Sequence, residues 1–168
     1  ILARRQPAAS DLRLIIGISK SVIDLERIGD EATKIAKRTL QLSEDGAAPR
    51  GYDEIRHIGA QVRRMVQEAL DAFARFDVDL ALAVSQYDKT IDREYKSALR
   101  ELVTYMMEDP RSISRVLSVI WVLRSLERIG DHARNIAELV VYMVHGTDVR
   151  HKSLLPSKSP DEPADTPE

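Results

Sequence analysis

One six-residue stretch occurs twice in the sequence, and this repeat limits the folds that the chain can adopt. Leu-Glu-Arg-Ile-Gly-Asp stands at residues 25–30 and again at residues 126–131, a shift of 101 residues. Apolar residues flank both copies at three- and four-residue steps, which is the period of an amphipathic helix. A repeat of this quality predicts two similar helices in equivalent places of two similar structural units.

Four long segments have this helical period, and prolines, glycines and aspartates separate them. We expect helices over Pro7–Leu42, Tyr52–Arg75, Asp79–Glu108 and from Asp109-Pro110 to Gly146. Asp77 is a typical N-cap for the third helix, and Asp109-Pro110 suits the start of the fourth. No strand alternation competes with this pattern, so the predicted fold class is all-α.

The connections between the last three predicted helices are short, which favours an antiparallel three-helix bundle over residues 50–146. Residues 1–45 are then one long helix from a preceding, truncated bundle, because their repeated motif matches that of the last helix. The chain begins at Ile1, so we expect its natural N-terminus to lie upstream. Residues 147–168 hold four prolines and few apolar side chains, which predicts a disordered tail.

Composition excludes several classes of function. Cysteine is absent, so disulfides, thiolate zinc sites and cysteine nucleophiles are excluded, which suits a reducing cytoplasm. The sequence has 27 acidic and 25 basic residues, and residues 147–168 hold five of the acidic and three of the basic ones. The rest of the chain, which we call the body, therefore has 22 of each and is neutral. A neutral body argues against nucleic-acid binding, which needs a basic excess. The apolar stretches are too short for a bilayer span, which takes about 20 residues.

Paired carboxylates are the candidate functional groups. Glu127 and Asp131 lie four residues apart on the flank of the last predicted helix. Asp88 and Asp92 have the same spacing on the preceding helix. Like charges at this spacing repel on a helix, so their presence calls for a compensating group. The two midpoints lie 18 and 19 residues from the intervening turn, so antiparallel packing would bring both pairs to one height.

Four carboxylates at one place predict a site for a hard cation, because oxygen ligands suit such ions. The predicted ion is divalent or trivalent: Mg, Mn, Fe or Zn. The predicted ligands are Asp88, Asp92, Glu127 and Asp131, together with Glu26 and Asp30 at the equivalent angle of the first helix. The competing interpretation is a solvated face whose arginines pair with the acids. Gly29 and Gly130 favour close helix approach, since glycine costs about 1 kcal/mol relative to alanine within a helix.

Other polar and aromatic residues give weaker signals. Glu54 and His57 have the Glu-x-x-His spacing of di-iron bundles. The pattern occurs once and is expected to lie about 20 Å from the paired carboxylates, so we interpret both as ordinary surface residues. Trp121 lies off the apolar arc and is expected to be half-buried by packing, with an interface anchor as the alternative. The histidines without ligand spacing are expected to be solvated: His132, His145 and His151.

Residues 127–138, Glu-Arg-Ile-Gly-Asp-His-Ala-Arg-Asn-Ile-Ala-Glu, resemble the C-terminal signature of the PhoU family. Residues 6–13 resemble the segment that opens the last helix of the first bundle in that family, and residues 146–151 resemble a common family ending. The resemblance covers about residues 1–151. It implies a full protein of two three-helix bundles, of which this chain contains the second bundle and the last helix of the first.

The same resemblance implies a regulator and not an enzyme. The family represses phosphate uptake and the phosphate-starvation response at the cytoplasmic face of the membrane, which it reaches only through partners. Those partners are the ATPase of the phosphate ABC transporter and a phosphate-sensor histidine kinase. The family's acidic motifs bind metal in some members, which implies the six carboxylates as metal ligands here.

Truncation changes these expectations for the first copy of the motif. No acidic helix of this chain is left to face Glu26 and Asp30, so only the site at Glu127 should be complete. The first helix should expose about eight aliphatic side chains, which predicts a homodimer, with helices exchanged between chains as one arrangement. Two alternatives stay open: a ferritin-like carboxylate metal-binding enzyme and a purely structural helical bundle.

Overall fold

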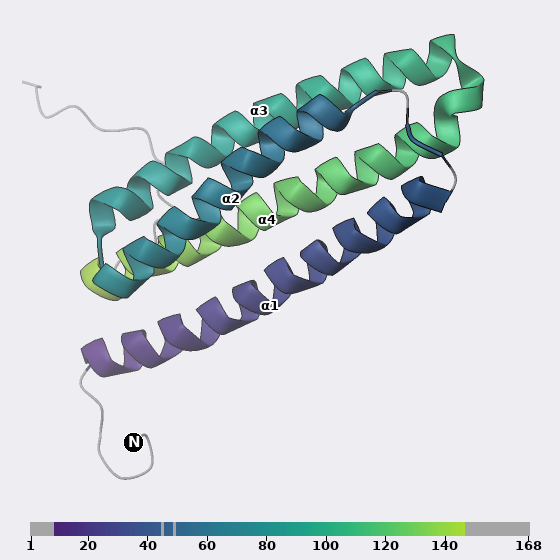
Figure 1. Cartoon of the computed structure of the whole chain (residues 1–168). Helices are drawn as coiled ribbons and strands as arrows, with labels where there is room; N and C mark the ends of the chain where they lie inside the picture. Colours follow the sequence, from purple (N-terminus) through teal and green to yellow (C-terminus); the bar gives the residue numbers. More distant parts are fainter. Residues whose placement is uncertain (1–8, 45, 49, 147–168) are drawn as a thin grey trace, which may run out of the picture.

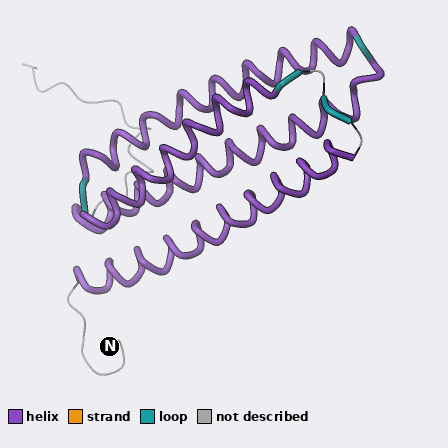
Figure 2. The backbone as a smooth tube through the Cα atoms, viewed as in Figure 1, coloured by secondary structure: helices purple, strands orange, loops and turns teal. Residues whose placement is uncertain are grey.

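The computed structural model describes residues 9–44, 46–48 and 50–146. Over these residues the chain forms four long α-helices and no strand (Figures 1 and 2). The helices are α1 Ala9–Glu44, α2 Tyr52–Arg75, α3 Val78–Glu108 and α4 Ile113–His145, with a 3₁₀ turn at Pro110–Ser112 before α4. The all-α prediction is confirmed. The predicted tail over residues 147–168 lies outside the described residues.

Turn residues set the helix ends close to their predicted places. α2 ends where Phe76 adopts a left-handed conformation, with φ of 54°. The carboxylate of Asp77 then accepts a hydrogen bond from the backbone N–H of Leu80 at 3.0 Å, so this residue is the predicted N-cap of α3. Asp109 caps the turn that begins at Pro110, and not α4 itself. The predicted start of the last helix is therefore wrong by three residues, because the proline opens a 3₁₀ turn first.

α2, α3 and α4 form an antiparallel three-helix bundle, and α4 is its most enclosed helix because α1 also covers it (Figure 1). Apolar side chains at helical spacing fill the bundle. The largest fully buried apolar side chains are Ile58, Val62, Met65, Val84, Ile91, Leu102, Val116, Val119, Leu123, Ile136 and Val140. Each contributes about 1.5–3 kcal/mol through burial, so this core fixes α3 and α4 at a defined separation and register.

α1 lies outside the bundle and packs antiparallel along α4 alone (Figure 1). Its buried side chains include Ser21, Glu31 and Leu42. Large aliphatic residues of α1 are exposed to solvent, and we call these the exposed α1 face: Leu12, Leu14, Ile18, Val22, Ile23, Leu25 and Leu40. The leftover helix of the sequence prediction is thus confirmed as separate from the bundle, although α4 gives it a partner.

The contact between α1 and α4 follows the 101-residue repeat. Under that shift, Asp24 is equivalent to Ser125, and Glu31 is equivalent to His132. In the structure Asp24 contacts His132, and Glu31 accepts a hydrogen bond from Ser125. The two contacts exchange equivalent positions, which is the hallmark of a twofold, isologous arrangement. The two repeated helices therefore pack against each other as approximate symmetry mates.

Candidate functional site

The two predicted carboxylate pairs come together between α3 and α4. We call Asp88 and Asp92 of α3 with Glu127 and Asp131 of α4 the acidic cluster. Asp88 is only 2% exposed. A Cβ added to Gly130 of α4 would lie 3.7 Å from Oδ1 of Asp88, so the two helices are close at this level. The antiparallel bundle positions the cluster, because its core sets α3 and α4 side by side in this register.

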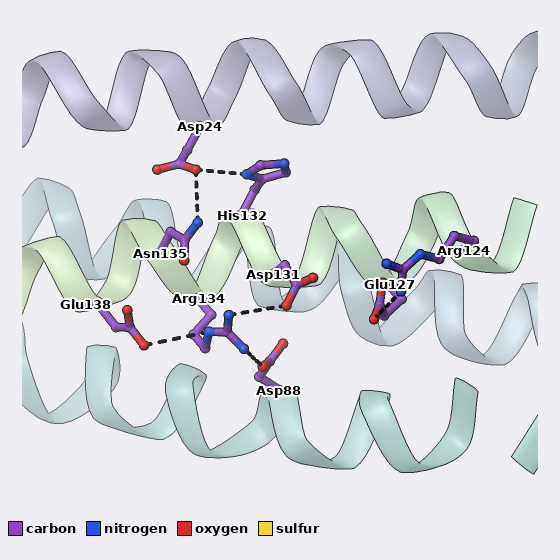
Figure 3. Close-up of polar contacts among 9 residues, drawn as sticks. All are labelled: Asp24, Asp88, Arg124, Glu127, Asp131, His132, Arg134, Asn135 and Glu138. Carbon is purple, nitrogen blue, oxygen red and sulfur yellow. Dashed lines mark hydrogen bonds and ion pairs between the residues drawn. The ribbon is translucent and has the colours of Figure 1, made fainter. Parts of the chain in front are cut away.

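The guanidinium group of Arg134 lies among the carboxylates (Figure 3). Its Nη1 donates a hydrogen bond to Oδ2 of Asp88, across the gap between α4 and α3. Its Nη2 lies 3.3 Å from Oδ1 of Asp131, and its Nε lies 3.6 Å from Oε1 of Glu138. One side chain thus links carboxylates on two helices.

Burial is the largest influence on Asp88, and it raises the pKa of this carboxyl group. The charge and hydrogen bond of Arg134 act in the opposite direction, while the negative charges of Asp131 and Asp92 raise the pKa further. The net result is a pKa above the ordinary value for aspartate. The protonated form of Asp88 is therefore favoured in the folded protein relative to the unfolded chain.

Glu127 is in a similar environment. Burial raises its pKa most, the charge of Asp131 raises it again, and Arg124 lowers it, with smaller increases from Asp92 and Asp88. Nη1 of Arg124 donates to both carboxylate oxygens of Glu127, at 2.8 and 2.7 Å. The net pKa lies above the ordinary value for glutamate. These effects place all four carboxylates within range of one another's charge.

The acidic cluster suits a hard cation in its chemistry but not in its present geometry. In the described part of the chain, no group of three or more His, Cys, Asp or Glu side chains is placed to hold a metal ion. Arg134 engages Asp88 and Asp131, and Arg124 engages Glu127. Three of the four acids are therefore paired with guanidinium groups. Metal ligation by the cluster stays a prediction.

The first copy of the motif is in a different environment. Glu26 and Asp30 are exposed on α1 and do not join the acidic cluster. A Cβ at Gly29 would meet nothing within 4 Å, whereas Gly130 is buried next to Asp88. The close helix approach predicted from both glycines is therefore wrong for Gly29. For Gly130 the helices are near, but an added Cβ would make only ordinary contact.

A second polar cluster, at the α1–α4 contact, was missed from the sequence. Nδ1 of His132 lies 2.8 Å from Oδ1 of Asp24, and Nδ2 of Asn135 donates to the same oxygen at 3.2 Å (Figure 3). The side chain of His132 is 18% exposed. The prediction that this histidine is solvated is wrong, because α1 covers the side of α4 from which it projects.

Glu31 anchors the other half of this contact and is 3% exposed. It lies 3.0 Å from Nε of Arg128 and 2.8 Å from Nζ of Lys34. Burial raises its pKa, but hydrogen bonds from Lys34 and Ser125 and the charge of Arg128 outweigh burial and leave the pKa below the ordinary value. The signal in the sequence was the seven-residue spacing of Asp24 and Glu31, which puts both acids on one side of α1.

The remaining predictions concern the exposure of single residues. Trp121 is 55% exposed on α4, which is close to the half-buried side chain that the sequence predicts. His57 is 66% exposed and lies 3.3 Å from Glu94, as a surface residue would. His145 is exposed as predicted, and His151 lies outside the described residues. Among the described helices, none is both long and apolar enough to cross a bilayer.

Comparison with known proteins points to one family. A family model described as the PhoU domain matches residues 1–39 and 55–140 of the chain. The chain is 84% identical over 154 residues to the phosphate-specific transport system accessory protein PhoU homolog of Pseudomonas putida, covering 92% of this chain and 60% of that protein. It is 46% identical over 151 residues to the phosphate-specific transport system accessory protein PhoU of Escherichia coli K12. This match covers 90% of this chain and 62% of that protein.

Solved structures agree with these matches. The crystal structure of PhoU from Pseudomonas aeruginosa superposes with a TM-score of 0.85 at 82% identity, covering 87% of this chain and 70% of that one. The structure of the phosphate transport system regulatory protein PhoU from Streptococcus pneumoniae superposes with a TM-score of 0.77 at 34% identity, covering 85% and 67%. The chain spans about three fifths of the length of the curated relatives that it matches.

Proposed function

The chain belongs to the PhoU family, and from this membership we propose that the protein is an accessory regulator of phosphate-specific transport. The observation that supports the proposal most is the 84% identity to the Pseudomonas putida accessory protein. The role that we propose is regulatory and not enzymatic: Asp88, Glu127 and Asp131 are paired with arginines, and the pair of Arg134 with Asp88 joins α4 to α3. In this role the protein represses phosphate uptake and the phosphate-starvation response.

The proposed partners are the ATPase of the phosphate ABC transporter and a phosphate-sensor histidine kinase. A cytoplasmic protein that reaches the membrane through these partners needs no spanning helix of its own. The resemblance of the motif at Glu127–Glu138 to the family signature, together with the names of the relatives, supports the transporter more directly than the kinase. The kinase link rests on the resemblance alone.

Gene disruption tests the regulatory role. In phosphate-rich medium, loss of the gene should switch on a reporter for phosphate-starvation genes, and the complete gene supplied in trans should silence it again. Disrupting the sensor kinase as well should abolish the induction, which tests the kinase link separately. A reporter that stays silent after the first disruption contradicts the proposed function.

We also propose that the protein is a homodimer in which the exposed α1 face is covered. Ile18 and Val22, at 45% and 58% exposed, lie near its middle. Covering several such side chains would contribute about 1.5–3 kcal/mol for each one fully buried. Light scattering should give the mass of a dimer, and Ile18→Glu with Val22→Glu should weaken it, whereas Leu82→Glu on α3 should not. A monodisperse monomer for the unaltered protein would contradict this proposal.

Of the alternatives, the ferritin-like enzyme has little support. Its Glu-x-x-His motif would have to point into a carboxylate cluster, whereas His57 is largely exposed and contacts Glu94. A purely structural bundle agrees with the ion pairs in the acidic cluster, and the reporter experiment separates it from a regulator. A cation at Asp88, Asp92, Glu127 and Asp131, or at Glu26 and Asp30, stays a prediction.

A further inference from the structure

The acidic cluster needs a positive charge between α3 and α4. Asp88 is almost fully buried, and an isolated buried carboxylate is strongly unfavourable unless it is paired or hydrogen-bonded. Three further carboxylates within electrostatic range add repulsion to this cost. A bound cation is one way to supply the compensating charge. A side chain of the protein is another.

Arg134 has the geometry for this task. It projects from α4 three residues after Asp131, and its three nitrogens face Asp88, Asp131 and Glu138 (Figure 3). A guanidinium group is planar and permanently charged, with five N–H donors in a fixed fork, so one group can serve several carboxylates. The ammonium group of a lysine is a single point of charge and would not span the same three acids.

The repeat within the chain offers an internal comparison. Under the 101-residue shift, the positions of Arg124 and Arg134 correspond to Ile23 and Thr33 of α1. Thr33 only donates a hydrogen bond to the backbone carbonyl of Gly29, at 2.9 Å. The first copy of the motif therefore has exposed acids and neither arginine, while the second copy lies next to the buried Asp88 of α3 and has both. The arginines occur where a buried carboxylate needs them.

We propose that Arg134 is the resident counter-ion of the acidic cluster, with its guanidinium group in the place that a divalent cation would otherwise take between Asp88 and Asp131. The side chain ties α3 to α4 without a metal. It also opposes metal binding, since a cation at the four carboxylates has to displace it from Asp88. Arg124 opposes metal binding at Glu127 in the same way, from the other end of the acidic cluster. This inference stands independently of the proposed role in phosphate transport.

Titration of the protein with Mn²⁺, followed by calorimetry and by the electron paramagnetic resonance of free Mn²⁺, tests this directly. Arg134→Gln should bind Mn²⁺ at least about tenfold more tightly than the unaltered protein, since changes around metal ligands alter affinity by about 10–100-fold. Asp88→Asn in the same background should abolish the gain. The matched control Arg63→Gln, which removes an exposed arginine from α2, should leave Mn²⁺ affinity unchanged.

Thermal unfolding provides a second readout, because it follows the stability of each protein with and without the metal ion. Without Mn²⁺ this variant should melt below the unaltered protein, and saturating Mn²⁺ should raise its melting temperature but leave that of the unaltered protein in place. Arg134→Lys keeps one positive charge, so its Mn²⁺ affinity should lie between those of the unaltered protein and Arg134→Gln. If Arg134→Gln does not fold with or without Mn²⁺, the affinity of Arg134→Lys relative to the unaltered protein tests the inference. Equal Mn²⁺ affinity in the unaltered protein and the arginine variants, or a gain that survives Asp88→Asn, would overturn the inference.

Discussion

The polar contact between α1 and α4 can be weakened at a single residue. Oδ1 of Asp24 is 2.8 Å from His132 and accepts a hydrogen bond from Asn135 at 3.2 Å, so Asp24→Ala removes both contacts at once. A net hydrogen bond is worth about 0.5–1.5 kcal/mol, and a buried group left without its partner costs about 1–3 kcal/mol. We therefore expect a loss of about 1–3 kcal/mol at this contact.

The loss should be local to α1, because this helix packs on α4 alone. Each 1.4 kcal/mol changes an equilibrium constant by about tenfold, so the opening of α1 should become roughly 5 to 150 times more frequent. Amide hydrogen exchange measures this opening residue by residue. Exchange should accelerate along the middle of α1 and stay unchanged in α2 and α3, whose packing does not involve Asp24.

Asp30→Ala is the matched control for this experiment. It removes a carboxylate from the same helix, but that carboxylate is exposed and lies six residues further along. Substitutions at such positions usually change stability by about 0.5 kcal/mol or less. Equal exchange in the Asp24 and Asp30 variants would refute the view that the polar contact fixes α1. Faster exchange throughout the bundle would refute the view that α1 opens by itself.

Three further predictions concern the bundle. Met65→Ala should lower the free energy of unfolding by about 2–5 kcal/mol in urea denaturation, because Met65 is fully buried, whereas the half-exposed Leu82→Ala should have a much smaller effect. Gly51→Ala should destabilise the start of α2, seen as a lower melting temperature, because φ is +99° and a Cβ would lie 2.5 Å from Cγ1 of Val119. The pKa of Asp88 is raised above the ordinary aspartate value of 3.8, so between these two pKa values the folded state holds a proton that the unfolded chain has lost. The contribution of Asp88 to the free energy of unfolding should therefore fall as the pH rises through this range. Unfolding at several pH values should show a steeper fall in the unaltered protein than in Asp88→Asn, in which the raised pKa of Glu127 still contributes; a difference of opposite sign contradicts the prediction.

The sequence predicted the helices and their register well because both depend on local signals. Apolar period and turn residues such as Asp77 fix the helix ends within a few positions. Short connections make neighbours antiparallel, and counting from the turn at Asp109 then places Asp88 beside α4 at the level of Gly130. Each step uses only spacing along the chain, so no knowledge of side-chain contacts was required.

The contacts of α1 were harder to predict because the repeat does not specify them. Similarity between residues 25–30 and 126–131 indicates equivalent places in two units, but not that the two helices pack against each other. The sequence therefore predicts a solvated His132, whereas α1 covers this side chain in the structure. The role of Arg134 was missed for a related reason: on a helix with many charges, spacing alone does not show which arginine reaches across to Asp88 on α3.

The repeated motif also shows that equal sequence does not mean equal electrostatics. Both copies present a glutamate and an aspartate four residues apart, yet Glu26 and Asp30 are exposed to water while Glu127 lies largely out of it and next to Asp131. Water compensates the first pair, whereas the second pair requires charges from the protein or a bound ion. A metal site inferred from this motif therefore has to be judged for each copy separately, from the burial of its acids and from the residues at the positions of Arg124 and Arg134.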